Sequence, residues 1–242
     1  MIFKAINIIF LGCLFFWGES NAQSLKIDAI EISAIGQIGD GDHGNYEYFI
    51  NNTRNPALFQ KGLIDQPNKA GIIRSSGFAI DFVFKQVTEP ANEFILGLQS
   101  GSVETEIFKD LTFQGDSSIF NSDVTNVSQF FTIRTGYHRI FRADKRIRLL
   151  AGTMIQLGIP VSSKTTQSVE TDFFTDEYKF FAKQSISIGY TISYGIRFTL
   201  FRNVHASFMS RPTFYFSQVD GSLSSSFLRG TNLTLQFKIR PK

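Results

Sequence analysis

The stretch from Gln184 to Phe201 alternates without a break between large apolar residues and mostly small polar ones. The apolar positions are Ile186, Ile188, Tyr190, Ile192, Tyr194, Ile196, Phe198 and Leu200. A period of two residues is typical of a β-strand with one apolar and one polar face. The run also exceeds the usual strand length of roughly 5–6 residues. The sequence therefore predicts one unusually long strand with two chemically different faces.

The polar face of this strand is unusual for a sheet in water. It carries Ser, Thr and Gly together with Arg197, whereas a soluble sheet exposes Lys, Glu and other long polar groups. Small residues suit the crowded, concave interior of a barrel. We therefore expect the small polar face to point inward and the apolar face to point outward into lipid. At about 3.4 Å per residue and a tilt of about 40°, the run spans more than the roughly 25 Å apolar band of a membrane barrel.

Seven further segments show a similar alternation, so we expect eight strands. They are Lys26–Gln37, Ser76–Val87, Glu93–Ile107, Val124–Phe141, Ile147–Ile159, Gln184–Phe201, Val204–Ser217 and Phe227–Ile239. Pro212 falls inside the seventh strand, where we expect a bulge or a position near the rim. The predicted fold class is all-β, a closed antiparallel eight-stranded up-and-down transmembrane β-barrel.

The connections between these strands alternate between long and short. The long ones are Ile38–Ser75, Lys109–Ser122, Pro160–Ala182 and Gln218–Ser226, and the short ones are Thr88–Asn92, Arg142–Arg146 and Phe201–Asn203. Transmembrane barrels have short turns on the periplasmic side and longer loops outside, and an even strand count leaves both termini on one side. The long segments are therefore expected to be extracellular loops.

The N-terminus has the features of a secretory signal. Lys4 supplies a positive charge, Ala5–Trp17 is an apolar core, and Ser20–Ala22 is a small-residue cleavage signal before Gln23. We predict a signal peptide at residues 1–22 and one barrel domain at residues 23–242. The only cysteine, Cys13, lies in the signal, so the mature chain is expected to contain no disulfide and no thiol nucleophile.

Composition excludes two other classes. A formal charge of +3 is too small to indicate nucleic-acid binding. Beyond the N-terminus no run of about 18 apolar residues occurs, so helical membrane spans are not expected there. Phe is abundant at 27 residues, which an alternating membrane barrel accommodates on its outer face.

Charged residues also fall on the predicted inner faces. Buried charges must pair or be solvated, and an eight-stranded barrel is just wide enough for its side chains to fill. We therefore expect a lumen charge network that acts as a plug, with a narrow water path for ions as the alternative. Its members are Asp81, Lys85, Glu93, Arg134, His138, Arg148, Arg197, Arg211 and Lys238.

The expected lipid-facing residues follow from the same phase. They are Phe78, Phe82, Phe84, Ile186, Ile188, Tyr190, Ile192, Tyr194, Ile196, Phe198, Leu200, Phe214, Phe216, Leu235 and Phe237.

The signal segment, the eight alternating strands and the terminal strand Leu233–Ile239 together resemble the small eight-stranded outer-membrane barrels of Gram-negative bacteria. The similarity is to the OmpA and OmpX types and to the broad families of outer-membrane β-barrel domains. It covers roughly residues 24–242 and rests on pattern. It implies an outer-membrane location, insertion by the barrel-assembly machinery, and contact with outer-membrane lipids and lipopolysaccharide. The terminal strand departs from the usual aromatic ending, because Phe237 is followed by five further residues.

One pair of residues suggests an enzyme instead. His205 and Ser207 share a strand face, which resembles the His-x-Ser of the barrel lipid A deacylases. That family also needs a carboxylate after the serine, and the only acid downstream is Asp220, in an expected loop. The pair also faces the expected lumen, so a polar contact near the rim is favoured over catalysis.

The function expected from these features is a non-enzymatic, structural or interaction role through long extracellular loops. The loop partner outside the cell is not identified, and no cofactor, metal site or catalytic residue is expected. The alternatives are a narrow porin-like ion pore, a lipid-modifying barrel enzyme, and a secreted soluble barrel that holds an apolar ligand against an inward apolar face.

Overall fold

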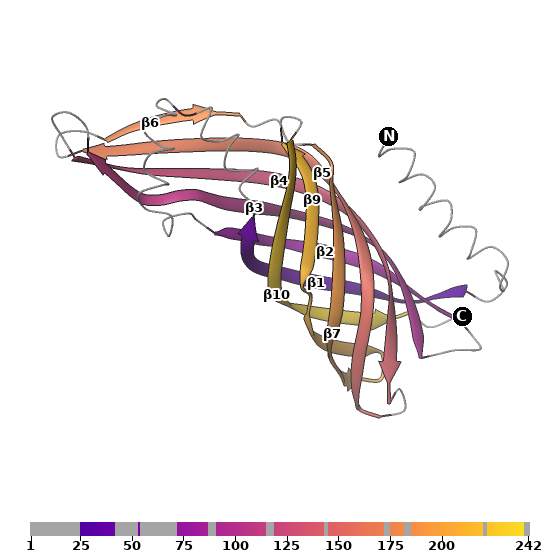
Figure 1. Cartoon of the computed structure of the whole chain (residues 1–242). Helices are drawn as coiled ribbons and strands as arrows, with labels where there is room; N and C mark the ends of the chain where they lie inside the picture. Colours follow the sequence, from indigo (N-terminus) through magenta and orange to yellow (C-terminus); the bar gives the residue numbers. More distant parts are fainter. Residues whose placement is uncertain are drawn as a thin grey trace.

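The structure is a computed structural model that describes residues 25–41, 53, 72–86, 91–114, 119–142, 145–171, 175–181, 185–219 and 222–239. Ten β-strands make up its regular structure (Figure 1). In these ranges no helix is long and apolar enough to cross a membrane. The predicted signal peptide at residues 1–22 lies outside the described residues, so the division of the chain at residue 22 stays a prediction.

The ten strands fill eight positions of one antiparallel sheet. They are β1 (Leu25–Gly41), β2 (Ile73–Gln86), β3 (Asn92–Gln114), β4 (Ile119–Phe141), β5 (Ile147–Thr171), β6 (Thr175–Phe180), β7 (Ser187–Phe201), β8 (Val204–Ser210), β9 (Thr213–Val219) and β10 (Ser222–Lys238). The strands β6 and β7 share one position because both pair with β5, at its end and along its first half. The strands β8 and β9 share another, because both pair with β7 and β10.

The sheet closes on itself. Strand β1 pairs with β10 from Ala29↔Lys238 to Gly41↔Ser226, so the first and last strands are neighbours. The row of paired residues that starts at Glu31 passes through all eight positions and returns to β1 at Gly41, ten residues further on. Such a stagger accompanies the strand tilt of about 35–45° that closure requires. The predicted closed antiparallel eight-stranded barrel is confirmed.

The proline inside the expected seventh strand interrupts it. Strand β8 ends at Ser210 and β9 begins at Thr213. The ladder continues across the gap, because the Arg211 N–H donates to the Gly230 carbonyl and the Pro212 carbonyl accepts from the Ile192 N–H, both at 3.1 Å. A local break of this kind accommodates a residue that has no N–H to donate.

The prediction of loops at Lys109–Ser122, Pro160–Ala182 and Gln218–Ser226 is largely wrong. Strand β3 continues to Gln114 and β4 begins at Ile119, while β5 continues to Thr171 and is followed by β6. Strand β10 begins at Ser222, directly after β9. These segments lack apolar alternation, yet ladder hydrogen bonds join backbone groups and need no apolar face. Most of the fourth long segment, Ile38–Ser75, lies outside the described residues.

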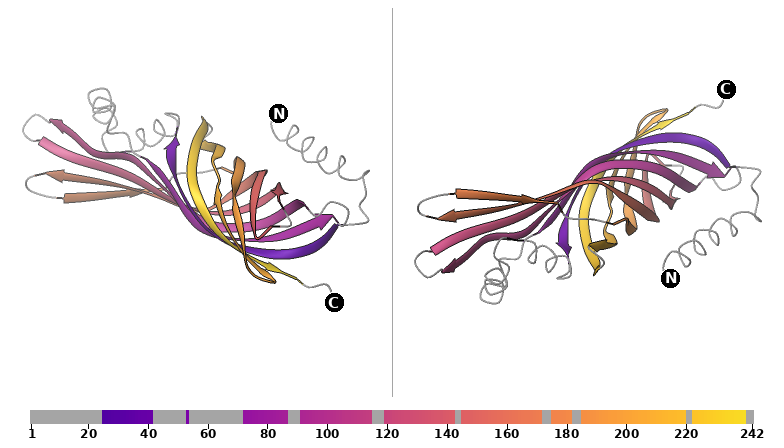
Figure 2. Two further views of the ribbon diagram at one scale, coloured as in Figure 1. Left: turned by 90° about the horizontal axis from the view of Figure 1, so that it is seen from below. Right: turned by 90° about the horizontal axis from the view of Figure 1, so that it is seen from above.

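Four strands project past the rest as a sheet of their own. Strand β2 pairs with β3 only as far as Thr105, and β7 pairs with β5 only as far as Gly158. Beyond these points β3, β4, β5 and β6 pair with one another, and both views of Figure 2 show them reaching past the other strands. We call residues 106–114, 119–127, 160–171 and 175–180 the extension.

Apolar side chains lie mostly on the outside of the barrel. Among the described residues, thirty-four large hydrophobic side chains are exposed, whereas only fourteen hydrophobic residues are buried. The buried set on the inner face is instead rich in Ser, Thr, Gln, Glu, Asp and Arg. The barrel is therefore inverted relative to a protein that folds in water.

One glycine gives a direct test of how closely the interior is packed. A Cβ at Gly97 would overlap the Asp81 carboxylate, whereas a Cβ at Gly36 would meet nothing within 4 Å. We expect Gly97→Ala to lower the free energy of unfolding by about 1–3 kcal/mol, the usual cost of overpacking. Gly36→Ala, as the matched control, should leave it nearly unchanged. Urea unfolding of both variants in lipid vesicles measures the difference, and equal values would contradict this packing.

Candidate functional site

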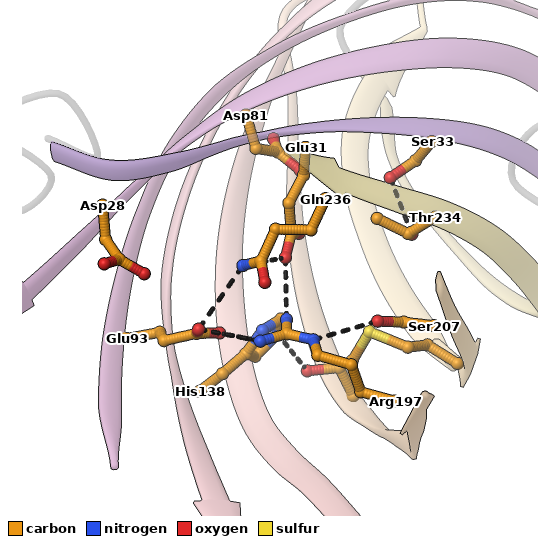
Figure 3. Close-up of polar contacts among 12 residues, drawn as sticks. Asp28, Glu31, Ser33, Asp81, Glu93, His138, Arg197, Ser207, Thr234 and Gln236 are labelled. Atoms are coloured by element: carbon orange, nitrogen blue, oxygen red, sulfur yellow. Dashed lines mark hydrogen bonds and ion pairs between the residues drawn. The ribbon is translucent and has the colours of Figure 1, made fainter. Parts of the chain in front are cut away.

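A buried arginine forms the centre of the barrel interior. Arg197 on β7 donates from Nη1 to both oxygens of Glu93, at 2.7 and 2.9 Å, and from Nη2 to Glu31 Oε1 at 2.7 Å. Its Nε donates to Ser207 Oγ at 3.1 Å (Figure 3). Because Glu31 lies on β1 and Glu93 on β3, this one guanidinium links three strands that are far apart in the sequence.

Two further side chains extend this cluster. The Gln236 amide on β10 donates to Glu31 Oε1 at 3.0 Å and to Glu93 Oε1 at 3.4 Å (Figure 3). Lys85 Nζ lies 3.2 Å from Glu93 and 3.0 Å from Asp28. Lys85 and Asp28 are partly exposed, so this end of the cluster reaches the rim at which β1 begins.

A second ion pair depends on a glycine, which leaves space where another residue would place its side chain. Asp81 and Arg134 are on β2 and β4, and Gly97 on β3 lies between them in the same row. Arg134 Nε donates to Asp81 Oδ1 at 2.6 Å, and Arg134 Nη2 donates to Oδ2. Because a Cβ at Gly97 would overlap the Asp81 carboxylate, glycine leaves the space through which the pair meets. Arg134 Nη1 also donates to Gln99 Oε1 at 3.2 Å.

A glycine also makes room for the buried histidine. His138 on β4 is paired in register with Gly152 on β5, where a Cβ would contact the imidazole ring. The ring therefore lies over β5 and reaches β7, where its Nε2 is hydrogen-bonded to Ser193 Oγ at 2.9 Å. This contact ties three neighbouring positions of the ring together.

The third fully buried guanidinium has no ionic partner among the described residues. Arg211 is 2% exposed, its Nη2 lies 3.5 Å from Met209 Sδ, and its Nε and Nη1 have no partner. Three fully buried carboxylates, Glu31, Asp81 and Glu93, therefore face three fully buried guanidiniums. Formal charge balances, but hydrogen bonding does not, because Glu31 Oε2 and Gln236 Oε1 also have no hydrogen-bond partner in the described part of the chain.

A cavity of about 90 Å³ lies toward the end of the barrel that carries the extension. It is lined by neutral side chains, including Ser75, Gln99, Ser128, Thr132, Ser187 and Tyr215. Arg197, Glu31 and Glu93 are not among its lining residues, so the ionic cluster lies outside it. In the described part of the chain, no group of three or more metal-ligating side chains is found.

The structure brings together most of the expected lumen charges. Asp81, Glu93, Arg134, His138, Arg197 and Arg211 are buried in the interior, and Lys85 joins Glu93. Arg148 and Lys238 are only half-buried, and Arg148 Nε donates instead to the Lys145 carbonyl at 3.0 Å in the turn before β5. These two do not join the central cluster.

Sequence reasoning missed the central carboxylate. Glu31 lies between two apolar residues, Ile30 and Ile32, so strand alternation puts its side chain inside when theirs face outward. An irregularity in the β1–β2 register between Ile27 and Ala29 obscures the alternation at the start of this strand. The expected charge network also omits Gln236, which is uncharged, and Asp28, which lies at this irregularity.

The residues expected to face lipid lie on the outer surface. All fifteen are exposed except Phe84 and Ile188, which are half-buried. The alternative of an inward apolar face that holds an apolar ligand is therefore wrong, because the inner face carries the ionic cluster and the outer face carries the large apolar residues.

His205 and Ser207 are not arranged as a base and a nucleophile. Both side chains are buried. Ser207 Oγ accepts from Arg197, and His205 Nδ1 is hydrogen-bonded to Thr199 Oγ1 at 3.1 Å. His205 Nε2 has no hydrogen-bond partner among the described residues, so the imidazole is not placed to take the proton of Ser207. Asp220, the only later acid, lies outside the described residues.

No protein-family model matches this sequence. No curated protein matches it either. Several solved structures align with this chain at low identity. Neisserial surface protein A aligns with a TM-score of 0.43 and 10% identity, over 90% of this chain and all of that one. Ail, the attachment invasion locus protein of Yersinia pestis, aligns at 0.29 and 10%, over 90% and 100%. A major outer membrane protein from Thermus thermophilus aligns at 0.38 and 10%, over 87% and 100%. At these values the function has to be inferred from this chain's own residues.

Two buried arginines should respond to the same substitution by different amounts. Arg197→Met leaves Glu31 and Glu93 buried without their main partner, which typically costs about 3–5 kcal/mol. Arg211→Met removes a cation that has no ion pair among the described residues, but it also leaves three buried carboxylates facing two guanidiniums. Because these two effects oppose each other, we expect it to change the free energy of unfolding by less than about 1 kcal/mol. Urea unfolding in lipid vesicles measures both. A loss of stability in Arg211→Met as large as that in Arg197→Met would contradict this assignment.

Proposed function

We propose that this chain is an integral outer-membrane β-barrel protein with a non-enzymatic, structural or interaction role. The observation that carries the proposal is the inverted barrel, with large apolar side chains outside and charged, hydrogen-bonded ones inside.

Physical chemistry favours lipid over water around such a barrel. Burying one large apolar side chain is worth about 1.5–3 kcal/mol, and here most of them are on the outside. Water-soluble monomers rarely expose contiguous apolar surface of more than a few hundred Å². Lipid cannot form hydrogen bonds with backbone N–H and C=O groups. A closed ring of strands pairs these groups with one another, so such a barrel is stable in a bilayer.

The uneven ends of the barrel support one orientation. In barrels of bacterial outer membranes, short turns and both termini face the periplasm, and longer segments face outward. Here the short turns, the start of β1 and the end of β10 lie at one end of the barrel, and the extension lies at the other end. We therefore propose that the extension is extracellular, in place of three of the extracellular loops expected from the sequence.

The extension is the proposed contact surface for a partner outside the cell or for lipopolysaccharide. Its exposed side chains carry both charges, including Lys164, Glu170, Asp176, Glu177 and Lys179. Ile107, Leu111 and Val124 are fully buried, so the extension has buried apolar side chains as well as exposed charged ones. The rings of Tyr178 and Phe180 lie 5.8 Å apart and give it an aromatic component.

The alternative of a narrow pore is less favoured. The ionic cluster joins β1, β3, β7 and β10 by hydrogen bonds of 2.7–3.4 Å, and its arginine and carboxylates are at most 1% exposed. Side chains packed in this way close the lumen of a small barrel. We propose that the cluster is a plug.

Location is tested by fractionation. We expect the protein to remain in the outer-membrane fraction, to need detergent for extraction, and to migrate differently on gels before and after boiling. In a Cys13→Ser background, Glu177→Cys should react with an impermeant maleimide on intact cells, whereas Arg202→Cys, in the turn between β7 and β8, should not. Release in soluble form with the periplasm would refute the membrane proposal, and the reverse labelling would refute the orientation.

The plug is tested by conductance in planar bilayers. We expect the wild-type protein to give no stable conductance step. The triple variant Glu31→Ser, Glu93→Ser and Arg197→Ser removes the central charges together and should open a measurable path. Its folding is verified by heat-modifiable migration. Steady conductance of the wild-type protein would instead favour the pore.

A further inference from the structure

The apolar part of the outer wall is short on β2 and β3. Along β2 the outward residues remain apolar over four positions, and along β3 over three. They are Phe84, Phe82, Ile80 and Phe78 on β2, and Phe94, Leu96 and Leu98 on β3. We call these seven residues the short wall.

Polar residues begin directly above the short wall. The next outward side chains are Ser76 on β2 and Ser100 and Ser102 on β3, and the hydroxyls of Ser76 and Ser102 lie 3.3 Å apart. Above them Arg74 is ion-paired with Glu106 and lies 4.0 Å from Glu104, with Arg74 and Glu104 nearly half exposed. Charged side chains at this exposure need water or lipid headgroups around them.

The apolar wall on β7 is much taller. Together with Ile186, directly before the strand, its outward residues remain apolar over eight positions, and we call these eight residues the tall wall. They are Leu200, Phe198, Ile196, Tyr194, Ile192, Tyr190, Ile188 and Ile186. In the ring order, β2 and β7 are four positions apart in either direction, so the two walls lie on opposite sides.

The two walls do not fit one bilayer thickness. Successive outward positions are two residues apart, so each rises about 5 Å along the axis of a barrel with tilted strands. The four positions on β2 then span roughly 15 Å and the eight on β7 roughly 35 Å, on either side of the typical apolar band of about 25 Å.

Tilting the barrel does not remove the difference. A flat slab of constant thickness crosses both sides of a tilted cylinder over the same length. A wall shorter than the bilayer is accommodated by local thinning, at a fraction of a kcal/mol per Å of mismatch. Without thinning, the hydroxyls of Ser76 and Ser100 would lie among acyl chains, where a poorly paired hydroxyl costs about 1–3 kcal/mol.

We propose that this barrel thins the bilayer beside β2 and β3, where lipid headgroups cover Ser76, Ser100 and Ser102. The inference rests on the proposed membrane location. The occupant of this surface is the headgroup layer of the lipids, because the surface changes from Phe and Leu through Ser to an Arg–Glu pair within a few positions. The same bilayer remains thicker beside the tall wall.

The control position on the tall wall follows from the register. The row through Ser100 passes Phe131 and Ile159 and reaches β7 at about Ile186. A row of paired residues rises ten residues toward the extension over the eight positions of the ring, and so about four residues over the three positions from β3 to β7. The β7 residue at the same height as Ser100 is therefore Tyr190, about four residues closer to the short turns than Ile186. Ser100 and Tyr190 thus compare the two walls at one height.

The experiment uses tryptophan fluorescence and brominated phospholipids. The chain has one tryptophan, so Trp17→Phe gives a background for single probes at Ser100→Trp, Phe84→Trp and Tyr190→Trp. Each variant is reconstituted in vesicles with bromine next to the headgroup or at the chain end, after heat-modifiable migration confirms folding. We expect headgroup-level bromine to quench the probes at residues 84 and 100 more, and chain-end bromine to quench the probe at residue 190 more.

The other outcomes separate this inference from the membrane proposal. If chain-end bromine quenches the residue-100 probe best, the bilayer is not thinned. If chain-end bromine quenches the residue-84 probe best, the barrel is tilted and the inference fails. If only the residue-190 probe is quenched, protein covers the short wall and the inference also fails. If no probe is quenched by either lipid, the membrane location fails with it.

Discussion

Ring closure is the constraint on which the rest of this molecule depends. A sheet whose outer face is apolar cannot leave an edge unpaired where water is absent, because each unmatched N–H or C=O would cost several kcal/mol. The seam from Ala29↔Lys238 to Gly41↔Ser226 removes that edge. Once the ring is closed, its stagger of ten residues fixes the tilt, and the alternation of side chains sorts every residue into the interior or the exterior. Even the Pro212 interruption keeps its neighbours paired across the gap.

Closure creates a second requirement, because the interior that it encloses must be filled. This chain fills it with ions and amides, and two glycines provide space: Gly97 for the Asp81–Arg134 pair, and Gly152 for His138. Arg197 contacts Glu31, 166 residues earlier in the chain, so the ionic cluster also connects the seam strand β1 to β7, three positions away in the ring. Buried ion pairs are weak evidence for stability, but breaking one is costly. The cluster therefore favours one arrangement of the strands over other registers.

The alternation of apolar and polar residues predicted the strands that have one face toward lipid and the other toward the lumen. The run from Ile186 to Leu200 is unambiguous because lipid-compatible and lumen-compatible residues differ in size and polarity. The same signal is absent from the extension, where water-compatible residues occur on successive positions, so segments such as Pro160–Ala182 were predicted as loops although most of them are strand. In the interior, the phase placed Asp81 and Arg134 on inward faces, but their pairing depends on register across β3, which a single sequence does not contain. Glu31 was missed because the irregular start of β1 blurred its phase.

The extension has a consequence for how such a chain can change in length. Beyond Glu106 and Gly158, the described parts of its strands form their ladders with one another, so their ends can grow or shrink without disturbing the ring. Adding the same number of residues to both arms of the β3–β4 hairpin preserves its pairing, whereas an insertion in one arm alone shifts the register and turns the following side chains to the opposite face. Variation in related chains is therefore expected to occur in matched steps at these tips, while strand lengths in the ring stay constant.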